Sequence, residues 1–173
     1  MTKHFSRRFT SRISWPAFWA IATLVFLFGY PVYLYVDTLI TGGISQRGDL
    51  LVVDLKALSS FEMDQDAGTS EDIPQRYRQL DGKRVLLTGQ MWDPYTAEGK
   101  IRTFTLVYSI SNCCFNGPPK VQHFIQATVP AGKEVDYSPD FVDVVGTLHV
   151  GVQSDAGHVQ SVYRIDVEKM ARD

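Results

Sequence analysis

The only two cysteines of the chain, Cys113 and Cys114, stand side by side in the segment SISNCCFNGPPK, ahead of a Gly-Pro-Pro turn. Two thiolates with an imidazole suit a soft or borderline metal such as Zn²⁺ or Cu(I), and the nearest histidine in the sequence is His123. Cys113, Cys114 and His123 are therefore candidate metal ligands. The pair lacks the C-x-x-C spacing of structural zinc sites, so the sequence does not specify a cofactor.

Two further interpretations of the cysteine pair stay open. A disulfide between adjacent residues strains the intervening peptide, and strained disulfides are readily reduced, so the pair would then act as a redox switch. Reduced cysteine instead behaves as a small buried hydrophobe. On that interpretation the segment is a structural plug, in which Phe115, Pro118 and Pro119 pack against one end of the fold.

A second candidate site is an interaction surface near the cysteine pair. Its candidate residues are Met91, Trp92, Phe115, Pro118 and Pro119. Aromatic and thioether side chains of this kind favour protein contacts, but filling of the core explains Met91 and Trp92 equally well.

The three histidines of the C-terminal part differ in their predicted settings. His123 alternates with Val121 and Ile125 in an inward phase, which is typical of a core or rim histidine rather than of a metal ligand. His149 falls on the outward phase of a later predicted strand, and His158 lies at a predicted hairpin.

No string typical of an enzyme occurs in the sequence. A nucleophile elbow, a phosphate-binding glycine loop and a metalloprotease helix are all missing. Cys113 or Cys114 with His123 would supply a nucleophile and a base, but nothing in the sequence orients the imidazole. We therefore expect a protein that is not an enzyme.

One N-terminal segment is apolar and long enough to cross a membrane. Residues 15–36, WPAFWAIATLVFLFGYPVYLYV, include no charged residue and no histidine, and a spanning helix needs about 20 residues. The basic tail of residues 1–14 predicts a cytoplasmic N-terminus and an exported remainder. A cleaved secretory signal is the alternative, but its apolar core is usually only about 7–15 residues long and ends in small residues.

The charge of the exported part excludes one class of partner. All 19 acidic residues follow Val36, together with 13 of the 17 lysines and arginines, so this part carries a net charge of −6. Because nucleic-acid binding depends on clustered basic residues, we expect no nucleic-acid partner.

The remaining sequence predicts a tether over residues 37–48 and a mainly β domain over residues 49–170. A short helix within IPQRYRQLDGKR, with Pro74 at its first position and Gly82 after its end, precedes the first long strand. Alternating apolar residues then predict five strands, over residues 83–92, 102–110, 121–128, 141–151 and 159–170.

The bends of these strands indicate the fold. Gly89 and Gly146 lie inside strands and predict sharp coiling or bulges, and SDAG at residues 154–157 predicts a hairpin turn. Five short strands with such bends predict a small OB-like barrel. An open antiparallel sheet or half-sandwich is the alternative.

Several segments resemble the bacterial DUF3299 family, a domain of unknown function in exported or lipid-anchored proteins. They are DGKRVLLTGQMWDP, FTLVYSISNCCFNGPP, VVGTLHVG and SVYRIDVEKM, and the resemblance covers about residues 49–170. The sequence departs from the family pattern at Gln90, which takes an aromatic position, and at Asn116, which lengthens the cysteine turn by one residue.

The resemblance implies an extracytoplasmic, OB-like domain, sometimes associated with ABC-transporter components and metal handling, and it brings no established catalytic residues. We therefore expect a single-pass protein of the bacterial inner membrane with a periplasmic binding or assembly domain, accessory to a transporter or another membrane complex. A metal-binding accessory protein and a thiol redox protein are the alternatives.

Overall fold

The computed structural model describes residues 15–92, 99–111 and 120–172, and the chain divides into two compact units after Asp37. Five residues of the predicted sites lie outside the described residues: Cys113, Cys114, Phe115, Pro118 and Pro119.

The N-terminal helix is the apolar helix predicted from the sequence. The α-helix α1 (Trp15–Leu24), the π-helical segment η1 (Val25–Gly29) and the α-helix α2 (Tyr30–Thr41) follow one another without a break. The stretch of 20 residues from Phe18 to Asp37 is long and apolar enough to cross a membrane. The large apolar side chains of the helix are exposed.

A hairpin begins where the sequence predicts a tether. β1 (Ile44–Arg47) pairs antiparallel with β2 (Leu50–Val53), across a two-residue turn in which Gly48 has a φ of 65°. β2 then pairs parallel with β3 (Lys83–Trp92). The polar residues after α2 therefore join the sheet within a few positions instead of forming a long connection.

Two short helices, α3 (Leu55–Leu58) and α4 (Gln75–Arg78), connect β2 to β3. The second is the helix predicted before the first long strand. Its Tyr77 is buried and donates a hydrogen bond from Oη to the carbonyl oxygen of Ala57 at 2.7 Å. Gly82 has the left-handed φ of 69°, but the helix already ends at Arg78 with Gln79 as its C-cap, so Gly82 does not terminate the helix as predicted.

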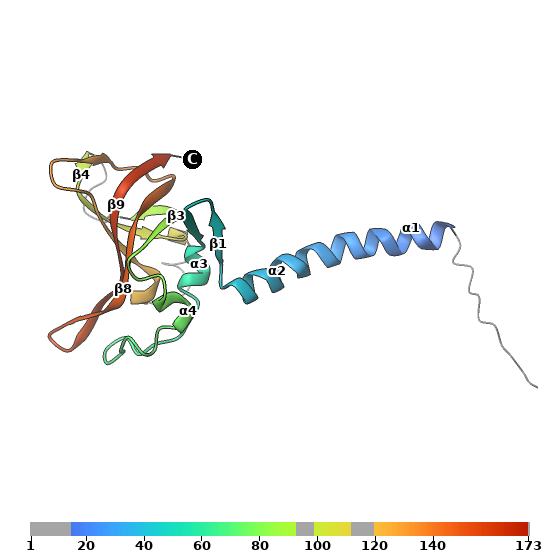
Figure 1. Ribbon diagram of the computed structural model, residues 1–173, viewed down its shortest axis with the longest axis horizontal. Coiled ribbons are helices and arrows are strands. Elements are labelled where there is room, and N and C mark those ends of the chain that lie inside the picture. Colours follow the sequence, from blue (N-terminus) through green and yellow to red (C-terminus); the bar gives the residue numbers. More distant parts are fainter. Residues whose placement is uncertain (1–14, 93–98, 112–119, 173) are drawn as a thin grey trace, which may run out of the picture. The chain divides into compact units, whose positions relative to one another are not determined.

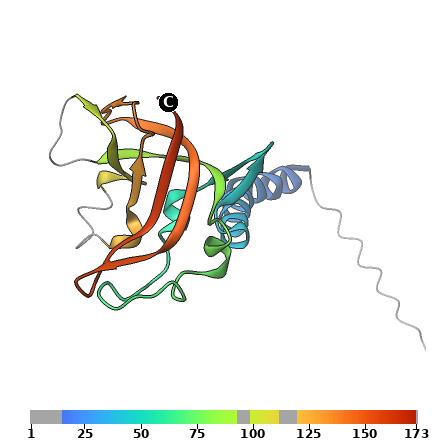
Figure 2. The same ribbon diagram turned by 60° about the vertical axis from the view of Figure 1, so that its left-hand side comes forward.

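The other strands of the domain are β4 (Lys100–Ile101), β5 (Thr103–Val107), β6 (Ile125–Thr128), β7 (Val135–Asp136), β8 (Phe141–Asp155) and β9 (His158–Arg172). β3 pairs antiparallel with both β5 and β8, β5 with β6, and β8 with β9, whereas β6 and β9 run parallel. These pairings close a ring in the order β3-β5-β6-β9-β8 (Figure 1 and Figure 2). With β3, β5, β6, β8 and β9 numbered 1 to 5, this order is 1-2-3-5-4, and the domain is mainly β as predicted.

One predicted strand is shorter than the sequence indicates. Residues 121–128 alternate like a strand, but the strand β6 begins only at Ile125, and Val121–His123 form the short 3₁₀-helix η2. The prediction that His123 lies on a strand is therefore wrong.

The two strand glycines lie where backbones approach closely. A Cβ at Gly146 would lie 2.2 Å from the carbonyl oxygen of Asp166, and a Cβ at Gly89 would lie 2.6 Å from that of Val107. The register of β8 against β9 also shifts between Val145 and Gly146. Gly146 thus matches the predicted bulge, whereas the register of β3 against β8 continues through Gly89 without a shift.

Side chains of the domain itself fill the inside of the ring. The buried residues include Val85, Leu87, Met91, Leu106, Ile125, Val142, Val144, Leu148 and Ile165. The buried Tyr163 donates a hydrogen bond from Oη to the carbonyl oxygen of Leu58 at 3.0 Å, and burial raises its pKa. Because the interior is occupied, a binding partner would meet the outer surface or the ends of the ring.

The turn of the β8–β9 hairpin gives a first prediction. Ala156 and Gly157 both have positive φ, 50° and 86°, between the paired Asp155 and His158, as a type I′ turn requires. Because asparagine tolerates this conformation better than alanine, Ala156→Asn should raise the free energy of unfolding by about 0.5–1 kcal/mol in chemical denaturation of the full chain. The opposite change at the next position, Gly157→Ala, should lower it. A less stable Ala156→Asn variant would contradict this account of the turn.

Candidate functional site

Glutamine side chains hold both flanks of the cysteine segment. On its N-terminal side, the backbone N–H of Ile110 donates to Oε1 of Gln90 at 2.9 Å. On its C-terminal side, the backbone N–H of Val121 donates to Oε1 of Gln65 at 2.8 Å. Gln90, which departs from the family pattern, therefore has a structural role here.

A buried amide anchors the C-terminal flank further. Gln122 is 1% exposed, donates from Nε2 to the carbonyl oxygen of Phe61 at 2.9 Å and accepts from Nε2 of Gln65 at 3.1 Å. Lys120 forms an ion pair with Glu62 beside it. These hydrogen bonds and this ion pair hold residues 61–65 against residues 120–122.

His123 is the one predicted metal ligand among the described residues. It is half-buried, and its ring meets that of Tyr108 edge-on, with 6.2 Å between centroids. Burial lowers the pKa of His123, the positive charge of Lys120 lowers it further, and Glu62 opposes both effects. No group of three or more His, Cys, Asp or Glu residues that could hold a metal occurs within residues 15–92, 99–111 and 120–172.

The lowered pKa of His123 gives a second prediction. A histidine whose pKa is lower in the folded state binds its proton more readily when unfolded, so it destabilises the fold as the pH falls below the ordinary value of about 6.5. NMR titration of its imidazole protons should give a pKa below 6.5, and His123→Gln should lose less stability between pH 7 and 5.5 than the wild type. A titration midpoint above 6.5 would contradict the described environment.

The predicted interaction surface is wrong at one of its two described residues. Met91 is fully buried inside the ring, because it shares the inward phase of β3 with Val85 and Leu87. Trp92 has the opposite phase, is half-buried and stacks on Phe124 with 5.4 Å between ring centroids. Of these two residues, Trp92 is therefore the one that can contribute to a surface.

The other two histidines each bind a carboxylate elsewhere. Nε2 of His149 lies 2.9 Å from Oδ2 of Asp166 on the outer face, as the outward phase predicts. Nδ1 of His158 lies 2.7 Å from Oδ1 of Asp66. This contact joins the β8–β9 hairpin to the acidic loop, residues 64–72, between α3 and α4. The structure does not bring these histidines into a cluster with His123.

The acidic loop caps its own backbone. Asp64 accepts hydrogen bonds from the N–H groups of Ala67 and Asp66, which lower the pKa of its carboxyl group. Asp72 accepts from the N–H of Thr69 at 2.7 Å. Asp64 and Asp72 therefore act as turn-forming residues.

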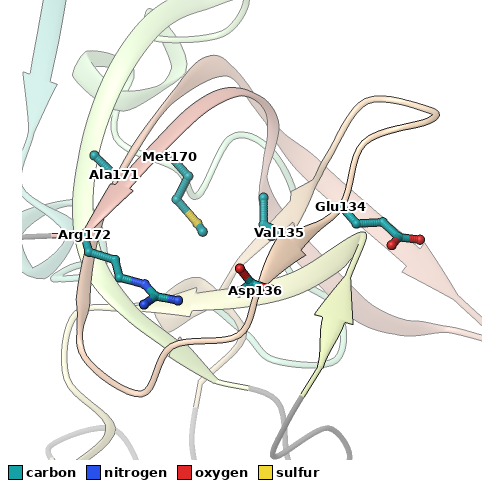
Figure 3. A pocket seen from close by; sticks show the side chains of 6 residues that line it. All are labelled: Glu134, Val135, Asp136, Met170, Ala171 and Arg172. Atoms are coloured by element: carbon teal, nitrogen blue, oxygen red, sulfur yellow. The ribbon is translucent and has the colours of Figure 1, made fainter.

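An open pocket of about 350 Å³ lies between β7 and the end of β9. Its lining residues are Glu134, Val135, Asp136, Met170, Ala171 and Arg172. Figure 3 shows Met170, Asp136 and Arg172 pointing into the hollow and Glu134 pointing away from it. No sequence signal indicated this pocket, because Asp136 and Arg172 belong to no motif and lie far apart in the chain.

The comparisons with known proteins concern the β domain. Residues 46–172 match the sequence profile of a family described as "Protein of unknown function (DUF3299)". The crystal structure of a DUF3299 family protein from Pseudomonas aeruginosa PAO1 is similar to this chain, with 24% sequence identity and a TM-score of 0.43. The similarity covers 56% of this chain and 64% of that protein, which is less than two thirds of its length. No curated protein matches the sequence.

Proposed function

The chain belongs to the DUF3299 family of proteins of unknown function, and on this premise we propose that it is a membrane-anchored binding or assembly module. The apolar helix over Phe18–Asp37 is the anchor, and the β domain is the module. We propose that the module is accessory to a transporter or another complex of the bacterial inner membrane.

The contrast between the helix and the β ring carries this proposal. Among the described residues, every large exposed hydrophobic side chain except Phe141 lies between Trp15 and Ile40. An exposed apolar helix of this length is suited to a lipid environment, whereas the ring buries its apolar side chains within itself. A domain with a filled interior on a membrane anchor is suited to holding a partner at the membrane.

The orientation is part of the same proposal. We place the basic residues 1–14 in the cytoplasm and the acidic β domain in the periplasm, in accordance with the positive-inside tendency. Protease added to spheroplasts should then digest the β domain, and intact cells should protect it. Digestion that requires lysis of the inner membrane would contradict the orientation.

Purification of the full chain from detergent-solubilised membranes tests the binding role itself. We expect a partner protein to remain attached in a stoichiometric amount. A solitary chain would contradict the proposal.

Metal binding is a second candidate function, and the environment of His123 favours it. Its lowered pKa favours the neutral imidazole, which is the form that coordinates metals, and we propose Cys113 and Cys114 as the other ligands. Protein purified without chelator should then contain stoichiometric Zn²⁺ or copper, and Cys114→Ser should lose it. Metal-free protein with two free thiols would contradict both this role and a redox role of the cysteine pair.

A further inference from the structure

The ring of strands is split at one end. β6 and β9 pair from Ile125 and Tyr163 as far as Thr128 and Asp166, although β9 continues to Arg172. After β6 the chain makes a turn over residues 130–133 and returns as β7, which pairs with β4. Among the described strands, β8 is therefore the one hydrogen-bonded neighbour of β9 beyond Asp166.

The pocket between β7 and β9 occupies this split (Figure 3). Its volume of about 350 Å³ lies near the lower end of the roughly 300–1,000 Å³ that is usual for ligand pockets. The opening thus suits a short segment of chain rather than a folded domain.

Opposite charges line the two walls of the split. The carboxylate of Asp136 on β7 and the guanidinium of Arg172 on β9 have no ion-pair partner among the residues that the structure describes, and both side chains point into the pocket. Glu134 differs from them, because it pairs with Arg102 at 3.2 Å. Met170 packs partly against the core and gives the pocket an apolar floor.

We propose that the split binds an extended peptide segment of a partner protein, which adds as a strand beside the end of β9. The inference rests on the proposed binding role and names the class of its partner. A strand edge without a neighbour offers main-chain groups for strand addition. Alternate side chains of an extended peptide point to the same side, so a basic and an acidic residue two positions apart would reach Asp136 and Arg172 together.

A fluorescein-labelled peptide, Val-Lys-Val-Glu-Val, tests the proposal by fluorescence anisotropy with the full chain in detergent micelles. We expect saturable binding that Asp136→Asn and Arg172→Gln each weaken at least fivefold. The matched control is Asp155→Asn, which removes an exposed carboxylate at the tip of the β8–β9 hairpin and should leave the affinity unchanged. The peptide Val-Lys-Pro-Glu-Val keeps the charges but lacks the central N–H, so it should bind more weakly.

Charge reversal provides a second variant. The pair Asp136→Lys and Arg172→Glu should prefer Val-Glu-Val-Lys-Val over the original peptide. Absence of saturable binding, equal binding of the proline peptide, or insensitivity to the pocket substitutions would each overturn the inference. If a partner remains attached to the full chain carrying Asp136→Asn and Arg172→Gln, the binding role stands and the split is not its site.

Discussion

Replacing both Val25 and Leu27 with arginine is expected to remove the chain from the membrane. Both residues lie in η1, in the middle of the apolar helix, and their side chains are exposed. One arginine at the centre of a membrane helix raises the free energy of insertion by about 2.5–3.5 kcal/mol, so two raise it by roughly 5–7 kcal/mol. The equilibrium constant for insertion should then fall by more than about a thousandfold. Immunoblots of membranes washed with alkaline carbonate should show a marked loss of the chain.

A matched double substitution separates charge from local packing. Val25→Leu with Leu27→Ile changes the same two positions and keeps the helix apolar, so this variant should remain in the washed membranes. If the arginine variant stays there in the same amount as the wild type, the helix is not the anchor.

Gly146→Ala is expected to lower the free energy of unfolding of the β domain by about 3 kcal/mol. The added Cβ would lie 2.2 Å from the carbonyl oxygen of Asp166 and 3.0 Å from Cγ1 of Ile165. The first neighbour is backbone inside the β8–β9 pair, so relief requires the two strands to separate at the position where they already shift register. Urea denaturation of the full chain, followed by tryptophan fluorescence and circular dichroism, measures the change.

The same strand offers the control. A Cβ at Gly151 would meet only Oγ of Ser70, at 3.9 Å, so Gly151→Ala should change stability by less than about 0.5 kcal/mol. Equal stability of the two alanine variants would show that close packing at Gly146 does not hold β8 against β9.

Alternation of apolar residues predicts the long strands well because each has one buried face. The predicted strand over residues 83–92 coincides with β3, and the strand predicted over residues 159–170 differs from β9 by one or two residues at each end. Gly146 interrupts such a pattern on its inward phase, which is why a bend was predictable there.

Alternation fails at η2 for a physical reason. Val121, His123 and Ile125 have the spacing of a strand, but Gln122 between them is buried and bonded to Phe61 and Gln65. These partners lie about sixty positions earlier in the chain, and such hydrogen bonds leave no periodic signal. The contacts of the residues that flank the cysteine segment are therefore visible only in the fold.

The pocket could not be predicted from the sequence either, because it also depends on segments that lie far apart in the chain. It forms because β6 stops pairing with β9 after Thr128, and the next strand, β7, pairs with β4 instead, from Val135. This change of partner opens a gap in the ring. The hairpin of β1 and β2, by contrast, could have been predicted from the sequence. Gly48 and Asp49 form a two-residue turn between ISQR and LLVV, in a segment that we expected to be a tether.

The most direct test of the proposed function is what remains bound to the full chain in its own membrane. Cells would be treated with a cleavable cross-linker, and the solubilised chain would be purified beside a control whose β domain is attached to an unrelated apolar helix. We expect the same partner protein, in a near-stoichiometric amount by quantitative mass spectrometry, with both anchors, because the β domain makes the contact. Recovery of the chain without an enriched partner, or of a partner that depends only on the native helix, would contradict the binding role of the domain.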